Sequence, residues 1–191
     1  MLKNNLKESL LELIIKKSFN YSSSSIFTLA SGKQSQYYFD CRPTTTDPLG
    51  QYLLGEIFFE KVSDFDISAI GGLTMGADPI AYAVCHTSYF KNKPIKAFVI
   101  RKEPKKHGLK KLIEGEVTKG EKVVIVDDVI TTGGSTIKAI NEARNAGLNV
   151  VKAVVLIDRQ EGGKDNIEKL DVKVESIFTK DEVFEAYKII L

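Results

Sequence analysis

The chain has 191 residues, of which 43% are hydrophobic, and a formal net charge of +2. This length suits one well-buried domain, and the near-neutral charge gives no general reason to expect nucleic-acid or membrane binding. Cys41 and Cys85 have neither CxxC spacing nor zinc ligands nearby, so we expect a cytoplasmic protein with reduced thiols.

The chain is expected to begin with an amphipathic helix over residues 1–20 that ends near Phe19, because apolar residues recur there on one helical face. The lysines and glutamates among them argue against a signal peptide or a membrane span. Short strands are predicted at residues 26–29 and 37–40, on either side of a turn at residues 31–32. Together these strands would form a small extended flap.

A second helix is predicted to begin after Asp47, whose carboxylate can cap it, and to end near Asp64. Helical spacing assigns five residues to its buried side: Leu49, Tyr52, Leu53, Ile57 and Phe58. A domain of this kind would consist of an N-terminal helix and hood over about residues 1–45 and an α/β core over about residues 46–191.

Residues 67–70 are predicted to form a short strand that leads into a glycine-rich turn and a third helix through Val84. Backbone N–H groups at Gly71 and Gly76 could bind an anion in this turn. Glycines also occur where a turn is merely tight, and that interpretation stays open.

The next predicted strand, residues 97–100, lies in a basic region, and the basic segment that follows this strand begins at Arg101. From Lys91 to Lys111 there are nine Lys or Arg residues and one acid, Glu103, which gives a local charge of +8. Pro104 and Gly108 oppose regular structure, so we expect a mobile loop over about residues 101–116. Such a loop could supply cations to a departing anion, or it could be a solvated face.

The most informative run starts with a predicted strand at residues 123–126 and continues through Asp127 and Asp128 into a hydroxyl-rich turn with Gly133 and Gly134. A helix is predicted from Thr136 through Arg144, capped by Gly147. The turn then lies at a helix amino end, where N–H groups and glycines suit a phosphate, while the carboxylates suit sugar hydroxyls. Neither a P-loop nor a dinucleotide fingerprint matches this spacing, and the alternative is an ordinary strand and helix with an aspartate cap.

Further strands at residues 150–157 and 172–178, and helices near residues 165–170 and 181–189, complete an alternating pattern. Strands that alternate with helices predict an α/β fold with a central, mostly parallel sheet. Ligands bind such sheets at the carboxyl ends of the strands, so the loops after four strands should share one edge: those after Ile70, Ile100, Val126 and Ile157.

Four stretches between about residues 27 and 163 resemble known motifs. The run from Val123 to Thr136 resembles the ribose-phosphate signature of the type I phosphoribosyltransferases, which bind 5-phosphoribosyl 1-diphosphate (PRPP). Residues 101–108 read RKEPKKHG and resemble the catalytic loop of the orotate phosphoribosyltransferase family. Residues 29–40 and 158–161 resemble the SGxxSxxYxD and DRxE segments of that family.

This resemblance implies a type I phosphoribosyltransferase fold, with a central sheet flanked by helices and a small N-terminal hood of helix and short strands. It implies an enzyme that joins orotate to PRPP, forming orotidine 5′-monophosphate and pyrophosphate in pyrimidine biosynthesis. The cofactor would be Mg²⁺, carried by PRPP rather than bound directly by protein side chains. The family is typically a homodimer in which residues 101–108 act in the neighbouring subunit's site.

The resemblance also assigns roles to residues. The catalytic group would be Arg101, Lys105, His107, Asp127 and Asp128. PRPP would be bound by Arg101, Lys102, Lys105, His107, Asp127, Asp128, Val129, Ile130, Thr131, Thr132, Gly133, Gly134 and Ser135. Orotate would be bound by Thr131, Arg159, Tyr38 and Phe39.

Two positions depart from some members of the family, because Ala30 and Met75 stand where those members have lysine. We hypothesise that Lys33 and Arg42 supply part of the missing positive charge. Two other functions remain as alternatives: a transferase for a purine base or xanthine, and a PRPP-sensing regulator that binds RNA through its basic segment.

Overall fold

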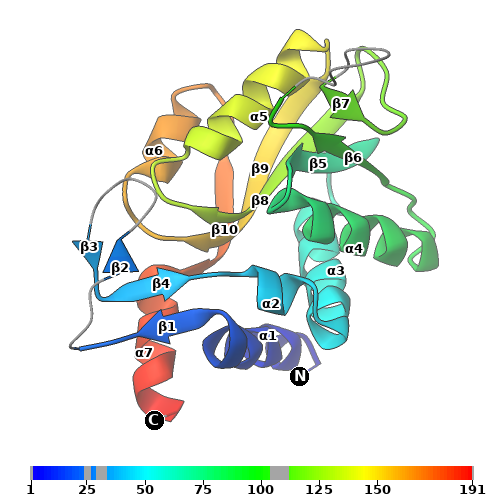
Figure 1. The fold of residues 1–191 in the computed structure, drawn as a ribbon. Coiled ribbons are helices and arrows are strands. Elements are labelled where there is room, and N and C mark those ends of the chain that lie inside the picture. Colours follow the sequence, from blue (N-terminus) through cyan, green and yellow to red (C-terminus); the bar gives the residue numbers. More distant parts are fainter. Residues whose placement is uncertain (1, 24–26, 29–33, 104–111, 191) are drawn as a thin grey trace.

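The protein is built on a six-stranded sheet with the strand order β10-β9-β8-β5-β6-β7, as Figure 1 shows. This computed structural model describes residues 2–23, 27–28, 34–103 and 112–190. Neighbouring strands are parallel except for the last pair, in which β7 runs antiparallel to β6. The strands are β5 (Ala69–Leu73), β6 (Lys96–Ile100), β7 (Ile113–Glu114), β8 (Lys122–Ile130), β9 (Asn149–Asp158) and β10 (Val174–Thr179). The expected mostly parallel α/β sheet is thus confirmed.

Helices cover both faces of the sheet, which is why β8 contains an uninterrupted apolar run from Val123 to Val126. In β8, Val124 and Val126 belong to one buried cluster, while Val123 and Ile125 belong to the other. Four helices contribute to the first cluster: α1 (Leu2–Lys17), α3 (Pro48–Val62), α4 (Ala77–Phe90) and α7 (Lys180–Ile190). Two contribute to the second: α5 (Gly134–Asn145) and α6 (Gly163–Glu168).

The hood contains four short strands, and their pairing differs from the predicted flap. Strand β4 (Tyr37–Phe39) pairs with β1 (Phe19–Tyr21), while β2 (Phe27–Thr28) pairs with β3 (Gln34–Ser35). Phe19 and Phe39 face each other with ring centroids 5.0 Å apart, so burial of this aromatic pair favours the β1–β4 pairing. The predicted turn at residues 31–32 lies outside the described residues.

Helix α3 starts as predicted, because the Asp47 carboxylate accepts hydrogen bonds from the N–H groups of Leu49 and Gly50. The predicted burial of Leu49 and Tyr52 is wrong, since these side chains are 50% and 55% exposed. The short helix α2 (Arg42–Thr45), which precedes α3, was not predicted.

The predicted turn at Gly71 and Gly72 is also wrong, because both residues lie within β5. A Cβ atom on Gly72 would come within 2.2 Å of the Val126 carbonyl oxygen, and one on Gly71 within 2.1 Å of the Phe98 carbonyl oxygen. These two glycines therefore allow the neighbouring strands to pack closely against β5. The turn begins at Thr74.

The two ends of the chain lie on the same side of the molecule, beyond the hood as seen from the sheet (Figure 1). Helices α1 and α7 are joined there by an ion pair between Lys7 Nζ and Glu182 Oε1 at 3.8 Å. Lys7 also lies over the ring of Phe178, 5.0 Å from its centroid. Among the described residues, no helix is long and apolar enough to cross a membrane.

Candidate active site

Two adjacent carboxylates of β8 form the centre of the site. The strand was predicted to end at Val126, but it continues to Ile130, so Asp127 and Asp128 lie inside it. Thr136 Oγ1 donates to Asp127 Oδ2 at 2.8 Å, and the Val129 N–H donates to Asp128 Oδ1 at 2.9 Å. Burial, and then the charge of Asp128, raises the pKa of Asp127; burial also raises the pKa of Asp128. The charged pair therefore needs hydrogen-bond donors or a cation from a ligand.

The turn after β8 has the geometry predicted for a phosphate site. Gly133 has a φ of +84° and precedes the first turn of α5, whose N–H groups have no carbonyl ahead of them in the helix. Asn166 Nδ2 of α6 donates to the Thr132 carbonyl oxygen at 3.1 Å, which fixes the turn from outside. Thr132, Gly134 and Ser135 are exposed and thus accessible to an anion.

The second wall of the site is the turn from Thr74 to Gly76. A Cβ atom on Gly76 would come within 2.4 Å of Asp128 Oδ1, so only glycine allows this approach. The Thr74 N–H donates to the Ile100 carbonyl oxygen at 2.8 Å, which ties the turn to β6. The turn and the carboxylates enclose a cavity of about 240 Å³, lined by Arg42, Leu73, Thr74, Met75, Gly76, Lys102, Asp127, Asp128, Val129 and Ser135. Gly71, paired within the sheet, is not part of this anion site.

Arg159 lies at the carboxyl end of β9 and is 4% exposed. Its backbone N–H donates to the Ile130 carbonyl oxygen at 3.0 Å, and its Nη2 is 2.8 Å from Glu161 Oε1. The guanidinium carbon lies 5.3 Å from the centroid of the Tyr37 ring. Among the described residues Arg159 Nε has no hydrogen-bond partner, so a buried donor is left for a ligand.

Of the three consecutive aromatic residues of β4, Tyr37 is the one on Arg159. Tyr38 is 36% exposed, with its ring 6.0 Å from that of Phe27, whereas Phe39 is 7% exposed and packs in the core. Phe39, which was predicted to contact the ligand, therefore does not present its ring to the site. The contact of Tyr37 with Arg159 was not predicted; strand alternation places Tyr37 and Phe39 on the face opposite to Tyr38.

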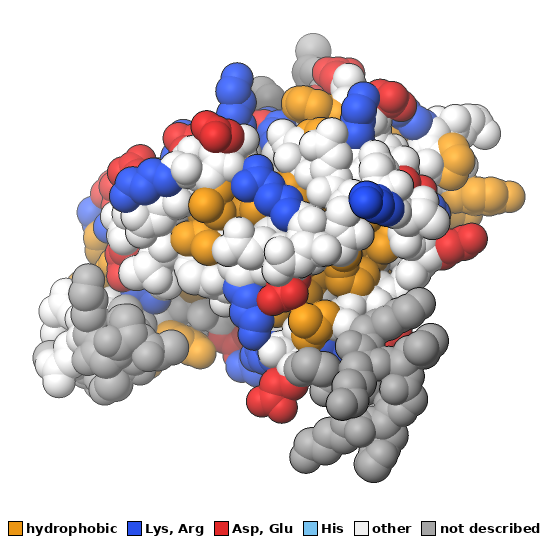
Figure 2. Space-filling model, turned by 90° about the horizontal axis from the view of Figure 1, so that it is seen from above, with side chains coloured by type: hydrophobic (Ala, Val, Ile, Leu, Met, Phe, Trp, Pro, Cys, Tyr) orange, Lys and Arg blue, Asp and Glu red, His pale blue; other side chains and the backbone are white. Residues whose placement is uncertain are grey.

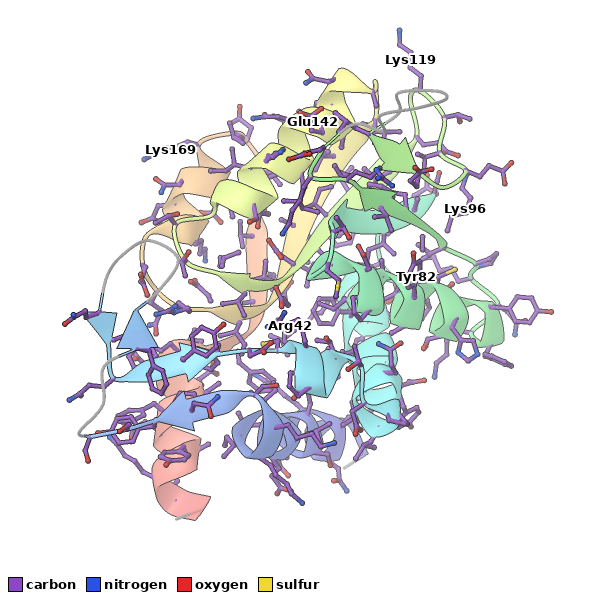
Figure 3. All side chains as sticks on the ribbon, viewed as in Figure 1. Arg42, Tyr82, Lys96, Lys119, Glu142 and Lys169 are labelled. Atoms are coloured by element: carbon purple, nitrogen blue, oxygen red, sulfur yellow. The ribbon has the colours of Figure 1, made fainter. Side chains whose placement is uncertain are left out.

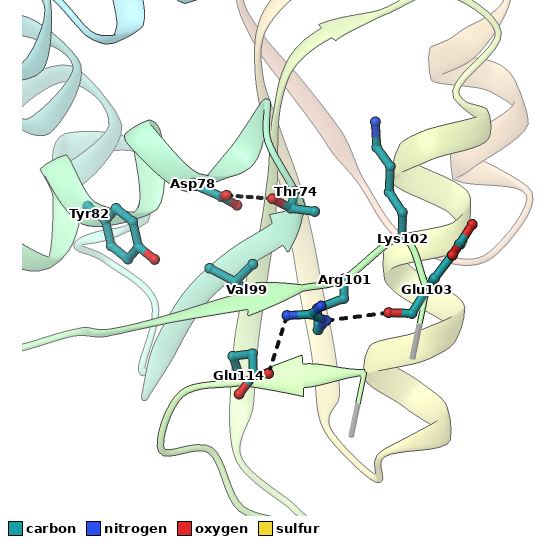
Figure 4. Close-up of a pocket in the computed structure, with 8 residues that line it drawn as sticks. All are labelled: Thr74, Asp78, Tyr82, Val99, Arg101, Lys102, Glu103 and Glu114. Carbon is teal, nitrogen blue, oxygen red and sulfur yellow. Dashed lines mark hydrogen bonds and ion pairs between the residues drawn. The ribbon is translucent and has the colours of Figure 1, made fainter. Parts of the chain in front are cut away.

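A second cavity, of about 670 Å³, adjoins the first and contains the start of the basic segment (Figure 4). Arg101 Nη1 lies 3.7 Å from Glu114 Oε1, and Arg101 Nε donates to the Glu103 carbonyl oxygen at 3.4 Å. Lys102 lines both cavities. The pairing of β7 with β6 was not predicted, and it makes residues 113–114 part of the sheet rather than of a loop. Lys105 and His107 lie outside the described residues.

Comparison with known proteins agrees with this geometry. The model of the phosphoribosyl transferase domain family matches residues 69–187. An orotate phosphoribosyltransferase of Aquifex aeolicus is 46% identical, over 93% of this chain and 97% of that protein. The chain belongs to the orotate phosphoribosyltransferase family. A Bradyrhizobium diazoefficiens member is 41% identical, over 97% of this chain and all of that protein.

Solved structures of the same family have the same fold. The Mycobacterium tuberculosis orotate phosphoribosyltransferase in complex with Fe(III) dicitrate aligns with a TM-score of 0.82 and 35% identity, over 93% of this chain and 98% of that one. The same Mycobacterium tuberculosis enzyme in complex with PRPP aligns with a TM-score of 0.76 and 30% identity, over 94% and 92% of the chains. The type I phosphoribosyltransferase fold predicted from the sequence is confirmed.

The structure brings most of the family's expected site residues to one edge of the sheet. The carboxylates, the turn through Ser135 and the start of the basic segment lie together, and Val129 and Lys102 share their cavity. Arg159 follows the neighbouring strand. Of the two residues hypothesised to replace the family's lysines, Arg42 lines the cavity, whereas Lys33 lies outside the described residues, as does Ala30.

Proposed function

We propose that the protein transfers the phosphoribosyl group of PRPP to orotate, forming orotidine 5′-monophosphate and releasing pyrophosphate. The observation that carries this proposal is the adjacent pair of buried Asp127 and partly buried Asp128 beside the turn at the start of α5, in a chain of the orotate phosphoribosyltransferase family. The ribose hydroxyls would donate to the carboxylates, while the N–H groups and hydroxyls of the turn bind the 5′-phosphate.

In this reaction the bond between ribose C1 and the diphosphate oxygen breaks, a bond from C1 to a pyrimidine ring nitrogen forms, and that nitrogen gives up its proton. The electron pair of the broken bond leaves with pyrophosphate, so the sugar becomes cation-like while negative charge grows on the leaving group. The carboxylates of β8 favour the positive sugar. Arg101 and Lys102, together with Lys105 and His107 of the same segment, would stabilise the leaving group, and His107 could share a proton.

The acceptor would lie near Arg159 and Thr131. Orotate is a planar carboxylate with ring oxygens, and the unpaired Nε of Arg159 is a buried donor suited to such an acceptor. Tyr37 holds the guanidinium from one side, and the partly exposed Tyr38 remains a candidate to stack on the base. These contacts favour orotate over a purine base, which has no carboxylate.

We propose that Mg²⁺ enters this site together with PRPP, as a companion of the substrate. Among the described residues, no cluster of three or more His, Cys, Asp or Glu side chains could hold a metal ion. Mg²⁺ commonly binds one or two carboxylates together with substrate phosphates, and Asp127 and Asp128 are available for that arrangement. When bound with PRPP, Mg²⁺ would neutralise charge on the diphosphate.

We further propose a homodimer. Helices α3 and α4 pack on each other and expose large apolar side chains, among them Tyr52 (55% exposed), Tyr82 (54%), Tyr89 (73%) and Phe90 (68%). An apolar surface of this kind favours burial against a second copy of the chain. The basic segment could then act in the partner's site. Light scattering would test the assembly, and a monomeric, fully active protein would contradict it.

The RNA-binding alternative has less support than the enzyme. On the face shown in Figure 2, Lys and Arg side chains of the described residues are interspersed with Asp and Glu. RNA-binding surfaces combine basic patches with aromatic rings.

The free thiols of Cys41 and Cys85 support a location in the reducing cytoplasm.

The test is to mix the protein with PRPP, Mg²⁺ and orotate and to follow the loss of orotate absorbance. Adenine, hypoxanthine, xanthine and uracil serve as comparison bases. We expect turnover with orotate and with none of the four comparison bases. No reaction with orotate, or faster reaction with a purine base, would refute the proposal.

A further inference from the structure

The cavity beside the two carboxylates has an unusual charge balance for a site that takes a diphosphate. Its described lining contains the acids Asp127 and Asp128, while the facing turn from Thr74 to Gly76 carries no charged side chain. A diphosphate placed there would be repelled by the carboxylates unless cations face it. Among the described lining residues those cations are Arg42 and Lys102.

Arg42 is held in a defined orientation by its neighbour Asp40. Its Nε donates to Asp40 Oδ1 at 2.7 Å, its Nη2 donates to Asp40 Oδ2 at 2.8 Å, and its backbone N–H donates to Oδ1 at 3.2 Å. The Arg42 hydrogen bond holds the pKa of the Asp40 carboxyl below its usual range, so this carboxylate stays charged at neutral pH. A guanidinium has five N–H donors, and two of them serve Asp40, so three remain for another acceptor.

The position of Arg42 favours a ligand over a structural role for these free donors. Its side chain is 60% exposed, and an exposed ion pair between residues two positions apart contributes little to stability. It is the first residue of α2, between the hood and the carboxyl edge of the sheet, near the middle of the view in Figure 3. Asp40 fixes the fork, which lowers the entropic cost of binding an oxyanion.

We infer that Arg42, oriented by Asp40, binds the diphosphate group of PRPP and the pyrophosphate product. This inference rests on the proposed transfer from PRPP and adds to it a fixed cation on the hood side of the leaving group. Arg42 contacts the substrate, and Asp40 acts as a positioning residue. The free pyrophosphate ion should therefore bind to the same place without orotate.

The experiment compares the wild type with Arg42→Ala, Arg42→Lys, Asp40→Asn and the double variant Asp40→Asn with Arg42→Ala, all as full chains. Calorimetric titration would give the dissociation constants of PRPP and of magnesium pyrophosphate, and steady-state kinetics would give KM for each substrate. Loss of charge-assisted hydrogen bonds should weaken both diphosphate ligands about ten- to a hundredfold in Arg42→Ala. The KM for orotate should stay unchanged.

Conservative variants separate binding from folding. Arg42→Lys keeps the charge but loses the bidentate grip on Asp40, so an intermediate affinity is expected. Asp40→Asn should weaken diphosphate binding in the wild-type background but have no further effect once Arg42 is alanine. Lys119→Ala, which removes one positive charge from an exposed residue at the far end of the molecule (Figure 3), is the matched control.

The outcomes distinguish this inference from the proposed function. If the wild type turns over orotate but Arg42→Ala binds PRPP and pyrophosphate as tightly as the wild type, the assignment of Arg42 is wrong. If the wild type fails to turn over orotate, the proposed function is wrong, and weaker pyrophosphate binding by Arg42→Ala would still support the anion contact. Equal weakening by Lys119→Ala would show a general charge effect and overturn the assignment.

Discussion

Replacing Asp127 by asparagine should make the ligand-free protein more stable at neutral pH. Burial and the adjacent Asp128 raise the pKa of Asp127 from 3.8 to about 8. The folded protein therefore retains a proton that the unfolded chain loses above pH 4. Stability from this group is fully present below pH 3.8 and is lost as the pH rises toward 8.

The magnitude follows from the width of that pH window. Each pH unit between the two pKa values costs about 1.4 kcal/mol, so at pH 7 the upper bound is about 4 kcal/mol. Relaxation around the charged pair reduces this, and we expect a gain of about 2 kcal/mol for Asp127→Asn, or about 4–8 °C in Tm for a chain of this size. Asparagine can keep both contacts, since its oxygen accepts from the Asp128 N–H and its amide donates to Thr136 Oγ1.

Thermal unfolding without ligand, measured at intervals from pH 4 to pH 8, would test this reasoning. The Tm difference between Asp127→Asn and the wild type should be near zero at pH 4 and grow with pH. Asp66→Asn is the matched control, because the Asp66 side chain is fully exposed. A difference that is independent of pH, or a less stable Asp127→Asn at pH 7, would refute the argument. The variant should also turn over PRPP poorly, because hydrogen-bond donors of the bound ligand favour the ionised form of Asp127, and asparagine cannot supply that charge to the cation-like sugar.

Three further predictions concern other parts of the molecule. Gly72→Ala should lower the free energy of unfolding by about 1–3 kcal/mol in urea titrations, because the methyl group of the new alanine would lie 2.2 Å from the Val126 carbonyl oxygen. An unchanged urea midpoint would show that the two strands can move apart at no cost in stability. Asp47→Ala should cost about 0.5–2 kcal/mol by the same measurement through loss of the α3 cap, whereas Asp47→Asn, which can still cap, should cost less. Lys105→Ala and His107→Ala should still bind PRPP in calorimetry but lower kcat about a hundredfold or more, and unchanged rates would remove both residues from the mechanism.

The sequence was most informative at the run that forms the ribose-phosphate site, because binding this ligand restricts both the residue types and the local structure. The run from Val123 to Thr136 predicted a buried strand, an acidic pair and a phosphate turn, since few other arrangements use these residue types in this order. The strand extends further than predicted, because the carboxylates of Asp127 and Asp128 are stabilised by hydrogen bonds within β8 and α5 rather than by solvent.

Features that depend on tertiary neighbours could not be predicted. Helical spacing placed Leu49 and Tyr52 on the apolar side of α3, but it cannot show which part of a wide apolar stripe the other elements cover. The glycines of β5 looked like turn residues because the carbonyl groups that approach them belong to distant strands. The orientation of Arg42 required the Asp40 contact, which no spacing rule indicates.

The position of the chain ends determines where the protein can be extended. Both ends leave from the outer side of the hood, next to the contact between Lys7 and Glu182, whereas the substrates would enter between the hood and the carboxyl edge of the sheet. An affinity tag or a second catalytic domain joined at either terminus would therefore project away from the entrance. Fusion proteins of either polarity should remain accessible to both substrates.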